Sequence, residues 1–106
     1  MSTMNPEKQI YQLLGLVQKS GSILIGSDRT IEYVKTGGVF FVLIAKDSGY
    51  RTQKTVRDKC NFYQVPFTNW GDSFTISQSV GKDKVSVIGI TDKGLAGKIE
   101  SLLQEN

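Results

Sequence analysis

A chain of 106 residues, of which 39% are hydrophobic and 9% aromatic, can bury one core but not two, so we expect a single domain over residues 1–106. One cysteine and no histidine exclude an internal disulfide and both Ser-His and Cys-His catalysis, and we expect neither a metal site nor a cofactor. A net charge of +3 is mildly basic, which permits a nucleic-acid partner without requiring one.

The hydrophobic runs are too short for a membrane protein. The longest, over residues 39–45, is far below the roughly 20 residues that a bilayer crossing needs. The first residues lack the basic flank and apolar stretch of a secretory signal. We therefore expect a cytoplasmic protein with no membrane partner.

The chain opens with a helix signal. Asn5 can cap a helix that has Pro6 at its first position, where the missing N–H costs nothing. Apolar residues then recur at i, i+3, i+4 and i+7, the spacing of one helix face: Ile10, Leu13, Leu14 and Val17. The helix should end near Ser20 and Gly21, because glycine readily adopts the left-handed terminal conformation, and a short strand over residues 22–25 should follow.

The next stretch predicts a second helix and a central strand. We expect the Ser27 side chain to cap this helix, and Gly37 with Gly38 to end it. Residues 39–45 are apolar at every position, which indicates a strand covered on both faces. Helices should therefore lie on both sides of the sheet.

The second half of the chain alternates in the same way. Residues 51–63 predict a helix in which Cys60 is a small buried hydrophobe, and Pro66 marks the strand over 65–68 as an edge strand. A helix of about two turns between Asp72 and Gly81, a strand over 85–90 and a closing helix complete the order. This alternation predicts an α/β fold, a three-layer α/β/α sandwich with a mixed sheet of about four strands.

Positive charge gathers in one segment between residues 46 and 59. Its basic residues, set against two acidic ones, are Lys46, Arg51, Lys54, Arg57 and Lys59. Such a segment can face phosphate, or it can be the solvated face of an ordinary helix. The sequence leaves both interpretations open.

Residues 23–29 run from a strand through Gly26 into a helix that opens with Ser27, Asp28 and Arg29. Free backbone N–H groups at a helix start, together with the helix dipole, form a natural site for phosphate or for polar base edges. An ordinary capped turn is the alternative, and local chemistry taken alone favours it.

Six strings follow in order along the chain and are suitably spaced. They are LLGLVQKSG (13–21), GSDRTIE (26–32), VLIAKDS (42–48), DKC (58–60), VGK (80–82) and ITDKGLA (90–96). Together they resemble the YlxQ-like bacterial proteins, which are similar to the archaeal and eukaryotic ribosomal kink-turn binders. The resemblance covers the chain from about residue 13 to residue 103.

This resemblance implies a mixed four-stranded sheet sandwiched by helices and a non-catalytic, RNA-binding function. In the family the turn before the second helix contacts the kink-turn, and its pattern is glycine, threonine, asparagine and glutamate, with a lysine three residues later. Here Asp28, Arg29 and Glu32 replace the asparagine, the glutamate and the lysine. The loop over residues 81–85 resembles the family's second contact. We therefore expect RNA to contact Gly26, Ser27, Asp28, Arg29, Glu32, Lys35, Lys46, Lys82, Lys84 and Val85.

The changed triad leaves two functions open. Arg29 and Glu32 are three residues apart and are expected to pair, which stabilises an isolated helix by about 0.2–0.5 kcal/mol. The first function is recognition of a kink-turn or a related irregular RNA, ribosomal or regulatory, by a monomer that binds no DNA. The alternative is a protein-interaction module of the same fold.

Two weaker hypotheses concern Asp47, Asp58 and Trp70. The two aspartates could form a catalytic carboxylate pair, but we expect solvated or capping roles and no enzyme. Trp70 could stack on a base, but an aromatic at the end of a strand is more often partly buried.

Overall fold

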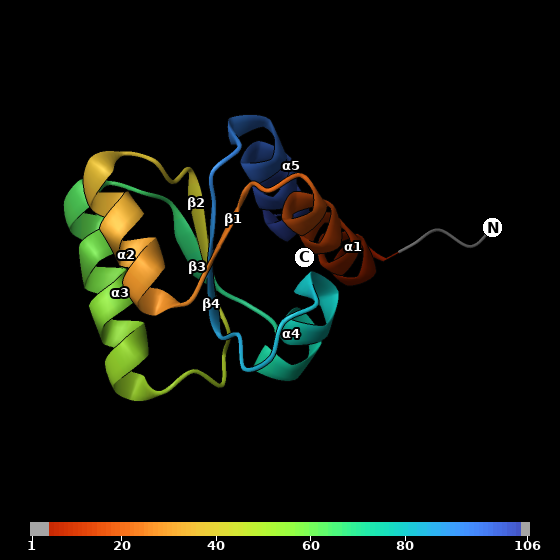
Figure 1. Ribbon diagram of the computed structural model, residues 1–106, viewed down its shortest axis with the longest axis horizontal. Coiled ribbons are helices and arrows are strands. Elements are labelled where there is room, and N and C mark those ends of the chain that lie inside the picture. Colours follow the sequence, from red (N-terminus) through yellow and green to blue (C-terminus); the bar gives the residue numbers. More distant parts are fainter. Residues whose placement is uncertain (1–4, 105–106) are drawn as a thin grey trace.

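The computed structural model describes residues 5–104 as a four-stranded sheet between two layers of helices (Figure 1). The elements are α1 (Pro6–Lys19), β1 (Ile23–Ile25), α2 (Ser27–Thr36), β2 (Phe41–Ile44), α3 (Tyr50–Tyr63), β3 (Phe67–Asn69), α4 (Ser73–Val80), β4 (Val87–Ile90) and α5 (Lys93–Gln104). The strand order is β1-β4-β2-β3, with β4 antiparallel to both neighbours and β2 parallel to β3. The predicted three-layer architecture with a mixed sheet is confirmed.

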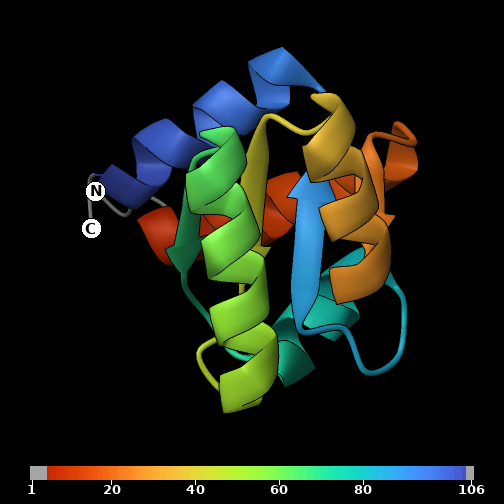
Figure 2. The same ribbon diagram turned by 90° about the vertical axis from the view of Figure 1, so that its left-hand side faces the viewer.

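The helices divide between the two faces of the sheet. Helices α2 and α3 lie side by side on one face, and α1, α4 and α5 cover the other (Figures 1 and 2). Strand β2 is internal and fully buried, as predicted, but it is shorter than the expected run over 39–45, in which Phe40 is 39% exposed. Leu43 packs into the core with α1, α4 and α5, whereas Val42 and Ile44 pack under α2 and α3. Alternation along the strand therefore supplies both cores.

Several helix ends follow the local signals. The side chain of Asn5 accepts a hydrogen bond from the Lys8 N–H at 2.8 Å and so caps α1. Gly37 and Gly81 end α2 and α4 in left-handed conformations, with φ of 80° and 68°. These three predictions are confirmed.

The prediction that Ser27 caps α2 is wrong. The N-cap is Gly26, at φ 97° and ψ 156°, and no side chain caps the helix within the described residues. Gly26 directly follows β1 and remains hydrogen-bonded to the start of β4, since its N–H donates to the Val87 carbonyl at 2.8 Å. The chain must turn into the helix within one residue, and this backbone region is essentially restricted to glycine.

Two details of the second half concern an edge strand and a buried thiol. In the part of the chain that the structure describes, strand β3 pairs only with β2, so it lies at the edge directly after Pro66, as predicted. Cys60 is fully buried, and this burial raises the pKa of its thiol to about 11. The thiol therefore stays protonated near neutral pH, which agrees with its interpretation as a small hydrophobe.

Candidate nucleic-acid interface

Three helices begin at the same end of the sheet. Strands β1, β2 and β3 all run opposite to β4, so their carboxyl ends lie where β4 begins. Each of these three strands leads into a helix, namely α2, α3 and α4. Figure 2 shows the start of α2 near the loop that enters β4. The turn at Gly26 and the loop over residues 81–86 are therefore brought together, although they are far apart in sequence.

Hydrogen bonds to the carbonyl groups of Ser86 and Val87, where β4 begins, hold this end of the sheet together. The Gly26 N–H donates to the Val87 carbonyl at 2.8 Å, and the Ala45 N–H donates to the Ser86 carbonyl at 2.8 Å. The Ser48 hydroxyl donates to the same Ser86 carbonyl at 3.2 Å. The Gly26 turn, the connection from β2 to α3 and the loop that precedes β4 are thus tied to one short segment.

The start of α2 faces outward without a protein cap. The first intrahelical bond runs from the Thr30 N–H to the Gly26 carbonyl at 3.1 Å. No side chain of residues 5–104 caps the N–H groups ahead of it. Asp28 and Arg29 are exposed, and Gly26 and Ser27 are partly exposed. An anion or a polar base edge can therefore reach these amides, which the helix dipole makes favourable for negative charge.

The charged side chains of α2 border one shallow hollow of about 440 Å³. Its lining residues are Asp28, Arg29, Ile31, Glu32 and Lys35. The expected pair between Arg29 and Glu32 is wrong, because no such ion pair occurs among residues 5–104. The guanidinium carbon of Arg29 instead lies 5.7 Å from the centroid of the Tyr33 ring, a cation–π contact at i, i+4. The Arg29 donors are therefore not committed to a carboxylate.

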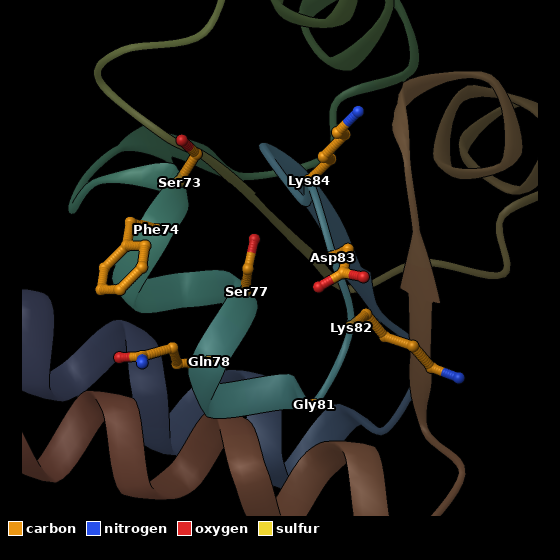
Figure 3. A pocket seen from close by; sticks show the side chains of 8 residues that line it. All are labelled: Ser73, Phe74, Ser77, Gln78, Gly81, Lys82, Asp83 and Lys84. Atoms are coloured by element: carbon orange, nitrogen blue, oxygen red, sulfur yellow. The ribbon is translucent and has the colours of Figure 1, made fainter.

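Helix α4 and the loop that follows it border a groove of about 530 Å³ (Figure 3). Its lining residues are Ser73, Phe74, Ser77, Gln78, Gly81, Lys82, Asp83 and Lys84. Phe74 is 70% exposed, and Lys82 and Lys84 are exposed on the loop. No motif in the sequence pointed to Phe74 or Gln78, which line this groove. The helical spacing of Ile76 and Val80 could have predicted the exposure of Phe74, because Phe74 lies outside the buried face that these two residues form on α4.

Two further predicted residues have different surroundings. Val85 is 1% exposed and packs into the core with α1, α4 and α5, so the expectation of a Val85 side-chain contact with RNA is corrected. Its N–H donates to the Ser77 hydroxyl at 2.8 Å, which makes Val85 an anchor of the loop. Strand β4 begins at Val87, two residues later than the predicted start at Val85. Lys46 is exposed on the connection between β2 and α3, at the same end of the sheet.

The two aspartates do not form a carboxylate pair with each other. Asp47 accepts hydrogen bonds from the Ser73 N–H at 2.9 Å and the Ser73 hydroxyl at 2.7 Å, which lower the pKa of its carboxyl. Asp58 pairs with Lys54 at 3.0 Å. Within residues 5–104 no group of three or more candidate ligands could hold a metal. No helix in this range combines the length and the apolar character of a membrane crossing.

Trp70 contributes to packing. Its ring centroid lies 4.7 Å from that of Tyr11, with the planes tilted by 46°, and both residues pack against the core under α1, α4 and α5. Burial is the largest of the causes that raise the pKa of the Tyr11 hydroxyl. The interpretation of Trp70 as a partly buried aromatic is confirmed.

Comparison with known proteins places the chain in a family. Residues 8–100 match the ribosomal protein L7Ae/L30e/S12e/Gadd45 family. The RNA-binding protein YlxQ of Bacillus subtilis (strain 168) is 34% identical over 93 residues, which cover 88% of this chain and 93% of that protein. The RNA-binding protein YlxQ of Enterococcus faecium is 32% identical over 104 residues, which cover 98% of this chain and 99% of that protein.

Two solved structures share the fold. A protein of unknown function from Bacillus halodurans C superposes with a TM-score of 0.87 at 32% identity, covering 90% of this chain and 96% of the other. The Giardia lamblia 15.5kD RNA binding protein superposes with a TM-score of 0.74 at 18% identity, covering 96% and 93%. The chain therefore belongs to the ribosomal protein L7Ae/L30e/S12e/Gadd45 family, as the resemblance of its motifs to YlxQ-like proteins implied.

Proposed function

We propose that this protein binds structured RNA without catalysing a reaction, and that RNA contacts the sheet end formed by the Gly26 turn and the loop over residues 81–86. The observation that carries the proposal is the uncapped start of α2, which is exposed beside Arg29 and joined to the β4 entry through Val87. Two relatives that cover nearly the whole chain are named RNA-binding proteins, which supports the same function.

The proposed ligand is a kink-turn or a related irregular RNA, whose splayed bases suit a surface made of two loops. Asp28 offers only acceptors, which suit base amino groups. The guanidinium of Arg29 offers donors to phosphate or to guanine O6 and N7. Glu32 adds a negative charge to the same hollow and disfavours a phosphate there. We infer that the bound RNA presents more base edge, and less phosphate, to α2 than the family pattern implies.

A gel-shift series over a panel of kink-turn and other ribosomal RNAs, at several salt concentrations, tests this function. We expect Arg29→Ala to weaken binding by about 1–3 kcal/mol if it contacts a base and to reduce the salt slope by about 0.7–0.9 if it contacts a phosphate. Lys98→Ala, on the exposed side of α5, is the matched control and should change little. Equal losses from both variants would show that the interface is misplaced.

The same assay tests specificity for the kink-turn. Glu32→Lys restores the family residue, and we expect it to increase affinity for a consensus kink-turn because it replaces a repelled charge with an attracted one. No gain would remove Glu32 as a determinant of RNA choice.

A protein-interaction module of the same fold is the second candidate. An apolar groove of about 630 Å³ between α1 and α5, where Leu16 is 52% exposed and Leu13 and Leu102 contribute to the lining, favours it. Absence of salt-dependent binding to every RNA of the panel would support this second function over the first.

A further inference from the structure

Helix α3 carries the whole net charge of the protein. It contains four basic residues and one acidic residue, Arg51, Lys54, Arg57, Lys59 and Asp58. The complete chain has 13 basic and 10 acidic residues and a net charge of +3, so the residues outside α3 are balanced at nine of each sign. Helix α2, the centre of the proposed interface, has two charges of each sign. The net charge of α3 therefore equals that of the whole chain, whereas α2 has no net charge.

These charges face solvent. Val56 and Cys60 are the buried residues of α3, whereas Arg51 and Lys54 are exposed and Arg57 is partly exposed. Among residues 5–104 the one ion pair is between Lys54 and Asp58, whose side chains are 55% and 59% exposed. Such an exposed i, i+4 pair is worth about 0.3–0.5 kcal/mol, so a phosphate can readily replace the carboxylate.

The charged residues of α3 are not placed where they would stabilise the helix through its dipole. A helix is stabilised by acidic residues in its first turn and basic residues in its last turn, and α3 has neither. Arg51 instead lies in the first turn, behind a Gly49 N-cap with no side-chain cap. Helices α1 and α2 both have an acidic residue in the first turn, whereas α3, α4 and α5 have none. The arrangement raises the positive potential at the end of α3 nearest the Gly26 turn.

Exposed aromatic rings accompany the basic residues. Tyr50 is 78% exposed at the first position of α3, and Phe62 is 77% exposed near its last. Phe62 also meets Tyr63 in an edge contact with ring centroids 4.9 Å apart. The basic side chains suit the phosphates that an RNA duplex presents, and the exposed rings suit unpaired bases where a duplex ends.

We propose that α3 is a second contact surface for the same RNA and holds the phosphates of a duplex arm that leaves the Gly26 turn. Helices α2 and α3 pack side by side and begin at the same end of the sheet (Figure 2), which makes the two surfaces continuous. Arg51, Lys54 and Arg57 follow one another at i, i+3 and i+6, on a helix of 14 residues that is about 21 Å long. This proposal rests on the proposed function, since the turn must first position the RNA.

Two triple variants of equal net charge test the proposal. The first replaces Arg51, Lys54 and Arg57 with glutamine, and the control replaces Lys8, Lys93 and Lys98, which are exposed on α1 and α5 across the sheet. Each reduces the net charge from +3 to zero, and glutamine is a good helix former, so circular dichroism should show both folded. The probe is a consensus kink-turn RNA with a long duplex arm, measured by fluorescence anisotropy over a series of salt concentrations.

We expect the α3 triple to bind about ten- to a hundredfold more weakly and to lose about 2–3 units of the slope of log K against log salt, the value for three phosphate contacts. The control triple should stay within about threefold of wild type and keep most of its slope, because long-range effects between exposed charges are screened. Shortening the duplex arm of the RNA should remove the difference between wild type and the α3 triple.

The outcomes separate this proposal from the proposed function. Equal losses in the two triples, or a difference that persists after the arm is shortened, would overturn the α3 contact. If the α3 triple binds like wild type while Arg29→Ala binds weakly, the α3 contact is wrong and the turn is right. Stronger α3-dependent binding to polyglutamate or to phosphatidylserine vesicles than to the RNA would also overturn it. A wild-type protein that binds no RNA of the panel overturns both proposals.

Discussion

The two faces of the sheet secure the starts of their helices in different ways. On one face, Asn5, Asp72 and Asp92 accept hydrogen bonds from backbone N–H groups at the starts of α1, α4 and α5. On the other face, α2 and α3 follow Gly26 and Gly49, and no side chain within residues 5–104 caps either helix. Protein groups satisfy the helix starts of the first face, whereas those of the second face remain available to a ligand.

The cores beneath the two faces also differ, in the number of residues that they bury. The core under α1, α4 and α5 contains 13 buried residues, and the core under α2 and α3 contains nine. Since buried apolar area is the main stabilising term, we infer that the first face supplies more of the folding free energy. The second face can then hold uncapped amides and unbalanced charge, because the first face offsets their cost in stability.

The largest effect is expected where α2 sits on the sheet. Thr30 is fully buried, and a Cβ at Gly89 of β4 would lie 3.0 Å from its Cγ2 atom. We expect Gly89→Ala to lower the free energy of unfolding by about 1–3 kcal/mol, because α2 must move away from the strand. Gly97→Ala on α5 is the control, since no atom of residues 5–104 lies within 4 Å of its added Cβ. Urea unfolding measures both, and a neutral Gly89→Ala would contradict the close approach.

The caps provide the second test of the comparison. Asp72 accepts from the Thr75 N–H at 2.8 Å, so we expect Asp72→Ala to lower the free energy of unfolding by about 0.5–2 kcal/mol. Ser27 makes no capping bond to α2, and Ser27→Ala should therefore cost less than about 0.5 kcal/mol, the usual range for surface substitutions. Urea midpoints compare the two variants. If Ser27→Ala costs as much as Asp72→Ala, the difference between the faces does not exist.

The elements could be predicted because their signals are local. The apolar stripe after Asn5, the glycines at 37 and 81 and the apolar run that contains β2 each act within a few residues, and the structure confirms all of them. The order of alternating helices and strands then led to the correct layers. The spacing of apolar residues and the local end signals were therefore enough to predict most of the fold.

The details of the site depended on long-range contacts, which periodicity does not report. Gly26 replaces Ser27 as the N-cap because the Gly26 N–H bonds to Val87, 61 residues later. Val85 is buried because its side chain packs into the core under α1, α4 and α5, and its N–H donates to the Ser77 hydroxyl. Arg29 had two neighbours within reach on its own helix, and it lies over Tyr33 and not beside Glu32. The sequence predicted which segments form this end of the sheet, but not which side chains of those segments face outward.

The smallest effect concerns the residue that links the two faces. Asp47 lies between β2 and α3, and its carboxylate accepts both hydrogen bonds that Ser73 donates at the start of α4. The Ser73 hydroxyl is the main cause that lowers the pKa of Asp47 from its ordinary 3.8. A lowered folded pKa means that the unfolded chain binds the proton first, so the stabilisation is complete above about pH 4 and is lost as the pH falls through the folded value.

We expect Asp47→Asn to be slightly less stable than wild type at pH 6, with the difference shrinking below about pH 4 as the wild-type carboxylate is protonated. Urea unfolding at a series of pH values measures this difference. Ser73→Ala provides an independent check, since removing the hydroxyl should move the pKa of Asp47 upward, towards 3.8, in an NMR titration. A difference between wild type and Asp47→Asn that does not change with pH would show that the link depends on the shape of the side chain and not on its charge.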